Sequence, residues 1–429
     1  MQNCELASTE ASERTLYRKV SWRLLPFLFL LFVIAYLDRM NISFAKLQMN
    51  SDLGFSDTVY GLGAGIFFLG YFFFEVPSNL ILHQVGAKFW LARIIIVWGF
   101  ISIGTLWVNS VASFYGLRFL LGAGEAGFFP GVIYYLTLWY PNLRRSQTIS
   151  VFLLAIPVTG ILGSVVSGWI MTVFDNWHGL HGWQWLFVME GIPAVVFGLL
   201  SFFVLSDSPS KASWLTENEK ALLLANLAAE KPSAQQPHAT LKDIAMSKPL
   251  WHLAVIYFLL VTGLYGISFW LPQIIRDFGS INLISIGLLT AIPYAVAMVG
   301  MVLISLHSDK TQERYWHLIA CAASTCLGFI LTVTFEQALL PSLAAFSLAT
   351  MSVLSSVAIF WSFPTALLSG RLAAGGIALI NSIGGLGGYA APALLGWLRD
   401  LTQQMESGLL SLAVAQALAI LLITRLKMR

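Results

Sequence analysis

Long apolar segments alternate with short polar segments along the whole of this chain. The apolar segments are about twenty residues long, which is the length that an α-helix needs to cross a hydrocarbon layer of ~30 Å. A soluble α/β protein would instead show apolar runs of about 4–8 residues broken by charged helix faces. The pattern therefore predicts an all-α integral membrane protein.

We predict twelve membrane-spanning helices in two sets of six. The first set covers 22–46, 58–81, 89–109, 113–137, 147–172 and 184–205, and the second covers 250–273, 284–306, 316–335, 340–363, 373–397 and 406–425. The predicted organisation is a cytoplasmic tail (1–21), a six-helix bundle (22–205), a cytoplasmic central loop (206–249), a second six-helix bundle (250–425) and a short cytoplasmic tail (426–429). In the central loop, Thr216 and Glu219 have capping-box spacing, which predicts a short helix there.

The two halves repeat one another. Gly160 and Trp169 recur as Gly388 and Trp397, at an offset of 228 residues in both cases. A tandem repeat of two six-helix bundles places a cleft at the interface between them, where transporters hold their substrates. The repeat therefore predicts two pseudo-symmetric bundles around a central site.

The composition and the distribution of charge predict where in the cell the protein is located. Hydrophobic residues make up 57% of the 429 residues, charged residues only 10%, and the mean hydropathy is +0.76. If the N-terminus is cytoplasmic, 19 of the 24 basic residues fall on the cytoplasmic side, as the positive-inside rule requires. No apolar segment with a cleavage site precedes the first span. We therefore expect a multi-pass protein of the bacterial cytoplasmic (inner) membrane with both termini in the cytoplasm.

Four charged residues lie deep in the predicted spans: Asp38 and Arg39 in the first, and Arg118 and Glu125 in the fourth. Asp38 and Arg39 belong inside the membrane because the uncharged run before them, 24–37, would reach only about 21 Å as a helix. Arg118 and Glu125 are seven residues apart and so share one helix face. A charge at the bilayer centre costs roughly 2.5–3.5 kcal/mol, so these residues predict a water-filled site rather than chance placement.

Two acids and two arginines sum to zero charge, and this balance suggests proton-coupled anion binding. An arginine fork binds both oxygens of a carboxylate, and an acid released from that arginine becomes easier to protonate. Entry of an anion into a negative interior is opposed by about 2.3 kcal/mol per charge per 100 mV, which a co-transported proton cancels. The alternative is that these residues form purely structural ion pairs between spans one and four.

Other polar residues in the spans carry weaker predictions. We interpret Glu75, near the inner end of span two, as a gate or helix anchor, and Glu190, near the outer end of span six, as structural. The spans of the second half have no charged residue well inside them. Their side of the site would then use the residues Tyr265, Trp361, Ser362, Asn381 and Ser382, of which Asn381 is the best candidate for ligand contact.

The chain resembles the major facilitator superfamily and, within it, the anion:cation symporter family. The motifs that carry the resemblance are YLDRMNI at 36–42, FEVPSN at 74–79, RFLLGAGEAGFFPG at 118–131 and NSIGGLG at 381–387. The resemblance implies that Arg39 and Arg118 contact or organise a substrate carboxylate, and that Asp38 and Glu125 take protons. It also implies substrate contacts for Tyr71, Trp361 and Asn381.

The superfamily's loop motif is degraded after span two, with His83, Gln84 and Ala87 at the usual charged positions. The copy in the second half is better kept, and it assigns gating contacts to Asp309, Lys310 and Arg314. Members that look similar transport tartrate, aldonates such as rhamnonate, phthalate and hydroxyphenylacetate.

We therefore expect proton-coupled uptake (symport) of a small organic carboxylate by a monomer in the lipid bilayer, working by alternating access. An anion exchanger without protons and a proton-driven exporter are the alternatives. An enzyme would need a polar catalytic cluster near one membrane face, and none is visible. No nucleotide-binding loop is present, the three cysteines have no framework spacing, and we expect no cofactor, metal, disulfide or nucleic-acid partner.

Overall fold

The structure is a computed structural model, and it describes residues 2–141, 144, 148, 152–229, 246–367 and 371–426. Side chains are described from residue 13 onward, with 365–367 and 371–375 excepted. Several residues that the charge analysis places on the cytoplasmic side lie outside this description: Arg145, Lys231, Lys242, Lys427, Arg429 and the side chain of Arg371.

Twelve segments of the described chain are long and apolar enough to cross a membrane, as predicted. The helices of the first half are α1 (Gln2–Leu53), α2 (Asp57–Val85), α3 (Ala87–Gly104), α4 (Val111–Glu125), α5 (Phe128–Thr137), α7 (Ala155–Val173) and α8 (Gly182–Val204). Those of the second half are α11 (Lys248–Asp277), α12 (Leu283–Thr311), α13 (Arg314–Thr334), α14 (Leu339–Phe360), α15 (Ser362–Leu367), α16 (Arg371–Gly385), α17 (Gly387–Thr402) and α18 (Glu406–Ile423). No strand occurs in the described residues.

Three predicted spans are broken rather than continuous. The fourth, predicted as 113–137, ends as α4 at Glu125 and resumes as α5 at Phe128. The tenth is interrupted at Trp361 and the eleventh at Leu386. Discontinuous helices of this kind are typical of transporter sites, because they place helix ends and free backbone groups at membrane depth.

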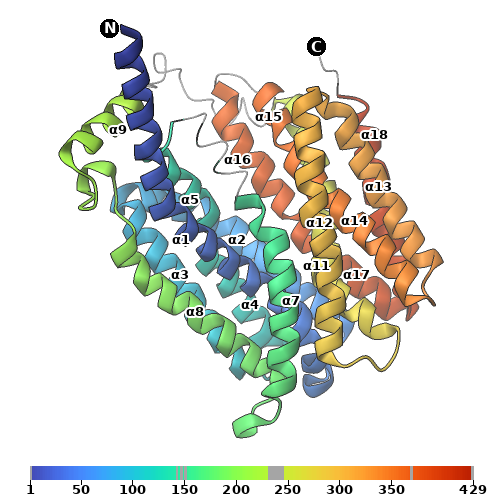
Figure 1. Ribbon diagram of the computed structural model, residues 1–429. Coiled ribbons are helices and arrows are strands. Elements are labelled where there is room, and N and C mark those ends of the chain that lie inside the picture. Colours follow the sequence, from blue (N-terminus) through green and yellow to red (C-terminus); the bar gives the residue numbers. More distant parts are fainter. Residues whose placement is uncertain are drawn as a thin grey trace.

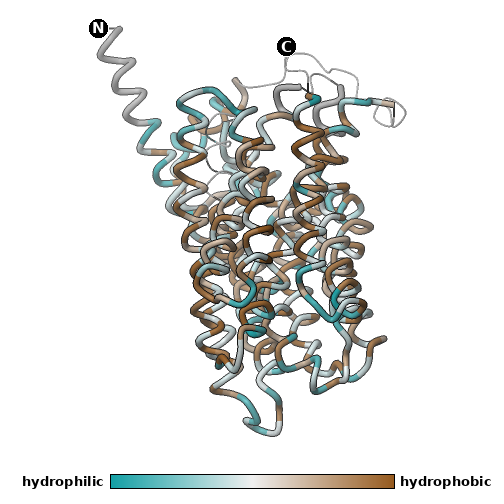
Figure 2. Tube along the Cα trace, turned by 90° about the vertical axis from the view of Figure 1, so that its right-hand side faces the viewer, coloured by the Kyte–Doolittle hydropathy of each residue, from teal (hydrophilic) through white to brown (hydrophobic). Residues whose placement is uncertain are grey.

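The helices form two pseudo-symmetric six-helix bundles, the first six spans and the last six. Within the bundles α3 packs on α8, α2 on α4, and α13 on both α14 and α18. Both chain ends lie at one end of the molecule, here called the termini end, and the opposite end is the far end (Figure 1). Apolar residues dominate the length of the helices while polar residues gather towards the two ends (Figure 2).

The bundles meet along α2 and α17 and along α7 and α12. Glycines allow backbone contact there: a Cβ added to Gly61 would come within 2.2 Å of the carbonyl oxygen of Pro392, and one on Gly168 within 2.4 Å of that of Leu283. Both contacts lie towards the far end, where α2 and α12 begin. The far end is therefore closed by direct helix contact between bundles.

The polar linker between the bundles contains the predicted helix, α9 (Glu217–Ala229). Its capping box forms as expected, since the Thr216 amide donates to Glu219 Oε2 at 2.8 Å and the Glu219 amide to Thr216 Oγ1 at 3.3 Å. Lys19 of α1 donates to the same carboxylate at 2.7 Å. These bonds, with that from Lys19 the strongest, lower the pKa of Glu219 and attach α9 to the first bundle.

Candidate functional site

The break in the fourth span positions Glu125. Ala126 leaves the helical conformation and Gly127 adopts φ 87°, which an L-residue with a side chain rarely does. A Cβ on Gly127 would also lie 2.4 Å from Ser78 Oγ on α2. Glu125 is thus the last residue of α4, and its carboxylate is placed beside α1 by a turn that requires glycine.

Arg39 of α1 pairs with Glu125. The Arg39 Nε donates to Glu125 Oε1 at 2.7 Å, and its Nη2 donates to the same oxygen. The Glu125 side chain is 1% exposed and the Arg39 side chain 14% exposed. The second carboxylate oxygen, Glu125 Oε2, has no hydrogen-bond partner in the described part of the protein. The ion pair is therefore buried and only partly satisfied.

Aromatic rings surround the Arg39 guanidinium. Its central carbon lies 5.6 Å from the ring of Tyr36, 5.3 Å from Phe67 and 5.2 Å from Tyr71. Across the bundle interface, its Nη1 donates to the hydroxyl of Tyr265 at 3.4 Å. Rings at these distances favour a cation, so Arg39 is held charged at the point where the two bundles face one another.

Arg118 is more deeply buried than Arg39, with 1% of its surface exposed. Its Nε and Nη2 donate to the carbonyl oxygens of Gly63 and Ala64 on α2, both at 3.3 Å, and its guanidinium carbon lies 5.2 Å from the ring of Phe67, which Arg39 also contacts. A close contact of α2 and α4 permits this, since a Cβ on Gly122 would come within 1.9 Å of the Phe67 carbonyl oxygen. Arg118 Nη1 has no partner among the described residues, and no acid lies within ion-pair distance of Arg118 there.

Asp38 forms no ion pair with an arginine in the described part of the chain. Asp38 is 2% exposed, and its Oδ1 accepts from Ser102 of α3 and from Asn41 Nδ2 at 3.2 Å. No basic side chain of the described chain comes within 4 Å of it. Asp38 lies on the face of α1 that meets α3 of its own bundle, whereas Arg39, one residue on, reaches Tyr265 of the second bundle. Neighbouring residues of a helix point about 100° apart, which separates the two charges.

Glu75 of the first bundle accepts hydrogen bonds from two polar side chains of the second bundle. Asn381 Nδ2 donates to Glu75 Oε1 at 3.1 Å, and Ser382 Oγ to Oε2 at 3.2 Å. On α2, Glu75 lies eight residues, about 12 Å, nearer the termini end than Phe67. Trp361 packs instead on Tyr257, with ring centres 4.9 Å apart. The predicted ligand residue Asn381 is therefore occupied by a contact between bundles in this conformation.

A second charged cluster, at the far end, was not anticipated from the sequence. The far-side ion network consists of Lys46, Asp57, Asp277, Arg399 and Asp400. Asp57 accepts from Lys46 at 2.7 Å and from Arg399 at 3.1 Å, and Arg399 pairs with Asp277 at 2.8 Å. Asp400 accepts from the backbone amides of Asp57 and Thr58 at 3.1 and 2.8 Å. The network crosses the bundle interface. Lys46 and Arg399 resemble ordinary loop charges in the sequence, and only their burial, 2% and 18% exposure, marks them.

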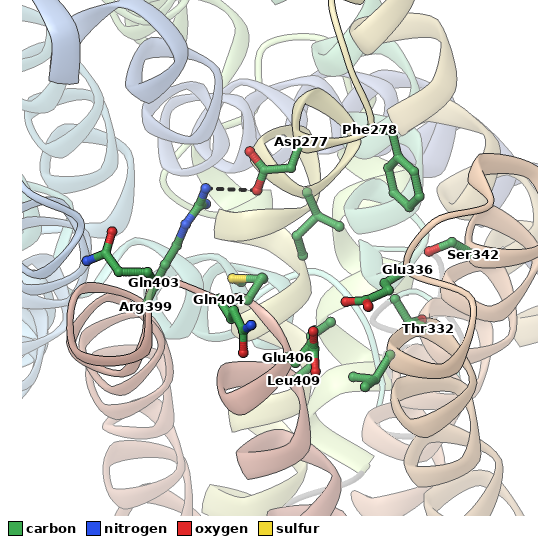
Figure 3. Close-up of a pocket in the computed structure, with 13 residues that line it drawn as sticks. Asp277, Phe278, Thr332, Glu336, Ser342, Arg399, Gln403, Gln404, Glu406 and Leu409 are labelled. Carbon is green, nitrogen blue, oxygen red and sulfur yellow. Dashed lines mark ion pairs between the residues drawn. The ribbon is translucent and has the colours of Figure 1, made fainter.

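Two cavities lie away from the Arg39 site. One of about 290 Å³ adjoins the far-side ion network within the second bundle, and Figure 3 shows Arg399 and Asp277 paired at its edge. There Glu406, by hydrogen bonding to Glu336, raises the pKa of Glu336.

The other cavity, of about 350 Å³, lies at the termini end and is lined by Leu153 and Leu154 of the first bundle and by Asp309, Arg314 and Ser362 of the second. Asp309 and Arg314 pair at 3.6 Å, and Lys310 is exposed beside them. No cluster of three or more potential metal ligands occurs in the described residues.

Residues 28–392 match the family model described as Major Facilitator Superfamily. The chain is 45% identical over 396 residues to a Pseudomonas putida protein described as "putative metabolite transport protein NicT", covering 92% of this chain and 91% of that one. It is 44% identical over 417 residues to a "putative tartrate transporter" of Agrobacterium vitis (96% and 95% covered).

A "quinolone resistance transporter" of Acinetobacter baumannii is 39% identical over 411 residues (96% and 94% covered). Among solved structures, the inward open xylose transporter XylE from E. coli superposes with a TM-score of 0.78 at 16% identity, covering 95% of this chain and 96% of that one.

Proposed function

The chain belongs to the Major Facilitator Superfamily and is a multi-pass membrane transporter rather than an enzyme, and from this premise we propose that it takes up a small organic carboxylate together with protons. The proposed substrates are tartrate, an aldonate sugar acid or an aromatic acid. The proposed location is a bacterial cytoplasmic membrane, with the termini end in the cytoplasm and a monomer working by alternating access.

The observation that carries this proposal is the ion pair of Arg39 and Glu125. Arg39 uses two of its nitrogens on one carboxylate oxygen, and its Nη1 reaches Tyr265 of the other bundle. A substrate carboxylate can take the same fork in the bidentate manner that guanidinium groups favour. Glu125 would then lose its cation while buried, and a buried carboxyl without a cation binds a proton. For a monocarboxylate, one substrate anion and one proton would enter the site with no net charge.

Roles for the neighbouring residues follow from their positions. Arg118 would organise the site by holding α2 and keeping positive charge behind Phe67, and Asp38 would take a further proton. Tyr71 and Tyr265 would line the site, with Trp361 and Asn381 reaching the substrate once Glu75 releases α16. This last step makes Glu75 a gate on the cytoplasmic side.

The site lies between two sets of contacts that join the bundles. The far-side ion network lies on the far-end side of the ion pair. The contact of Glu75 with Asn381 and Ser382 lies on its termini-end side. Opening one set while the other holds gives alternating access around a fixed site. At the cytoplasmic rim, Asp309, Lys310 and Arg314 are the proposed gating residues of the second bundle, beside the cavity at the termini end.

A panel of compounds in proteoliposomes tests the proposal. Tartrate, aldonates, phthalate, hydroxyphenylacetate and a fluoroquinolone would be offered with and without an imposed pH gradient. The proposal predicts that acid outside drives one carboxylate to accumulate and that a protonophore abolishes this. If exchange of substrate across the membrane proceeds but a pH gradient drives no net accumulation, the protein is an anion exchanger.

Export is the second candidate, because one relative is described as a quinolone resistance transporter. An exporter would extrude the fluoroquinolone against the same gradient. The two buried arginines favour a carboxylate, since Arg39 and Arg118 would both repel a cationic group.

A further inference from the structure

Aromatic rings from both bundles form one connected group around the Arg39 fork. We call the aromatic cluster the six residues Tyr36, Phe67, Phe68, Tyr71, Tyr265 and Phe269. In the first bundle, the ring centres of Tyr71 and Phe67 are 6.2 Å apart and those of Phe67 and Phe68 5.1 Å apart. Across the interface, the ring of Phe68 meets that of Tyr265 at 4.5 Å, and Tyr265 stacks on Phe269 at 5.8 Å. The surface that meets a ligand beside Arg39 is therefore mainly aromatic.

Hydrogen-bonding capacity beside Arg39 is low. Apart from Glu125, every described side chain that hydrogen bonds to the Arg39 guanidinium or lies over it is aromatic, so the polar groups offered to a ligand are tyrosine hydroxyls. Asn381 and Ser382 donate to Glu75, about 12 Å from Phe67 along α2. A hydroxy acid loses water from several hydroxyl groups on binding, and each one without a new partner weakens binding. An aromatic ring has no such requirement and gains stacked or edge-to-face contacts.

The positive charge available to a ligand is that of one guanidinium. Arg118 is 1% exposed and donates from two nitrogens to carbonyl oxygens of α2. Lys46, about two turns further along α1, is 2% exposed and pairs with Asp57 at 2.7 Å. Within the described residues, a ligand with two carboxylates would thus place the second one without a free cation. A monocarboxylate leaves no buried charge unpaired.

We propose that the substrate is an aromatic monocarboxylate, with its carboxylate on the Arg39 fork and its ring among the rings of the aromatic cluster. The inference rests on the proposed function and narrows its substrate class, because it disfavours tartrate, phthalate and aldonates. Tyr71 is the specificity-determining residue. Its side chain is partly exposed and its ring lies 5.2 Å from the Arg39 guanidinium, whereas the other five members of the cluster are at most 8% exposed.

Five acids of graded structure test the proposal: benzoate, cyclohexanecarboxylate, phthalate, tartrate and gluconate. Cyclohexanecarboxylate has the charge and nearly the size of benzoate but a saturated ring. Phthalate adds a second carboxylate to the aromatic ring, tartrate has two carboxylates and two hydroxyls, and gluconate has one carboxylate and many hydroxyls. Titration calorimetry of the full chain in lipid nanodiscs, at neutral pH and without a pH gradient, gives the dissociation constants.

Benzoate is expected to bind most tightly. Cyclohexanecarboxylate should bind about fivefold more weakly, which is the effect of losing one aromatic pair. Phthalate, tartrate and gluconate should bind about tenfold more weakly or worse, because each leaves a carboxylate or hydroxyls without partners.

Variants of Tyr71 separate the effect of its ring from that of its size. Tyr71→Leu keeps an apolar side chain without a ring, so benzoate and cyclohexanecarboxylate should bind with nearly equal affinity. Tyr71→Phe should keep the preference of about fivefold for benzoate. Phe73→Leu, at 62% exposure on the same helix and outside the aromatic cluster, is the matched control. Thermal melting of each variant checks that the fold is intact.

Tighter binding of tartrate, phthalate or gluconate than of benzoate would overturn the inference. Equal binding of benzoate and cyclohexanecarboxylate by the wild type, or failure of all five acids to bind, would overturn it too. A preference that persists in Tyr71→Leu would remove Tyr71 as the specificity-determining residue. The proposed function is judged separately, since it fails only if the proteoliposome panel shows no carboxylate accumulated by a pH gradient.

Discussion

The central ion pair and the far-side ion network are both buried charge clusters, but they are built differently. The central pair joins Arg39 to Glu125 within one bundle and reaches the other through Tyr265. The far-side ion network joins the bundles directly, through Asp57 with Arg399 and Arg399 with Asp277. Among the described residues, Glu125 Oε2 of the first has no partner; in the second Asp57 uses both of its oxygens, and the group without a partner is a donor, Arg399 Nη1.

This difference separates binding from closure. A cluster with spare hydrogen-bonding capacity inside one rigid bundle can exchange a partner for a ligand without moving helices. A cluster whose bonds cross the interface can break only if the bundles separate. The account therefore assigns substrate and proton to the central pair and conformation to the far-side ion network, and the predictions below test that division.

The largest effect is expected from Arg39→Ala. Removing one partner of a buried pair leaves the other uncompensated, at roughly 3–5 kcal/mol, and also removes the substrate's counter-charge. Arg39→Ala and Arg118→Ala should both abolish uptake, which here means a fall of about 100-fold or more. The measurement is initial uptake in proteoliposomes, with Arg23→Ala, exposed on the same helix, as the control. Uptake near the wild-type rate in Arg39→Ala would remove Arg39 from the site.

A selective effect is expected from Glu125→Gln. The amide cannot take up a proton, so substrate exchange across the membrane should continue while accumulation driven by a pH gradient is lost. We expect the accumulation ratio to drop from about tenfold or more to about one, since one unit of pH supplies about 1.4 kcal/mol per proton. Exchange and net uptake are measured in the same vesicles, with Glu217→Gln as the control. Gradient-driven accumulation by Glu125→Gln would disprove its assignment to proton coupling.

A smaller, conformational effect is expected from Asp57→Asn. The substitution weakens the contacts to Lys46 and Arg399 and should favour separation of the bundles at the far end, by roughly two- to fivefold in population. Distances between spin labels on the far ends of α2 and α17 would report this. Asp52→Asn is the control, because Asp52 lies at the same end and bonds to Trp183 of its own bundle. An unchanged distance distribution would mean that helix packing alone closes this end.

The smallest effect is expected from the linker. Because Lys19 and the Thr216 amide lower the pKa of Glu219, the stabilisation from this carboxylate is present above the ordinary value of 4.5 and is lost as the pH falls through the lowered folded value. Glu219→Gln should cost roughly 0.5 kcal/mol at neutral pH, as surface ion pairs do, and nothing in strong acid. Melting curves against pH check this, and an equal loss at all pH values would contradict it.

The membrane spans were predicted well from the sequence because each must be about twenty apolar residues long. This requirement can be recognised in the sequence without knowing any contact between helices. The sequence also revealed Arg39, Glu125, Arg118 and Asp38, since a charge in an apolar run is conspicuous. The partners of these residues could not be predicted from the sequence. The rotation of α1 about its axis decides that Asp38 accepts from Ser102 and does not pair with an arginine. The break after Glu125 depends on the backbone angle of Gly127, one glycine among several in that run.

The far-side ion network escaped prediction for a different reason. Asp57 and Arg399 lie at helix ends, where charge is ordinary, and Lys46 lies in the last two turns of α1; the approach of α2 to α17 buries the three together. Contacts between helices that are distant in sequence cannot be predicted from the pattern of apolar residues.

The most direct test of the account is to count the protons taken up when substrate binds. The purified protein, in weak buffer with a pH indicator, would be mixed with the carboxylate that the transport panel selects, at a pH where Glu125 is paired with Arg39. The account predicts uptake of about one proton per bound carboxylate by the wild type, and one proton fewer by Glu125→Gln at equal occupancy. Equal proton uptake by the two proteins would contradict the claim that a substrate carboxylate displaces Glu125 from Arg39 and leaves it to be protonated.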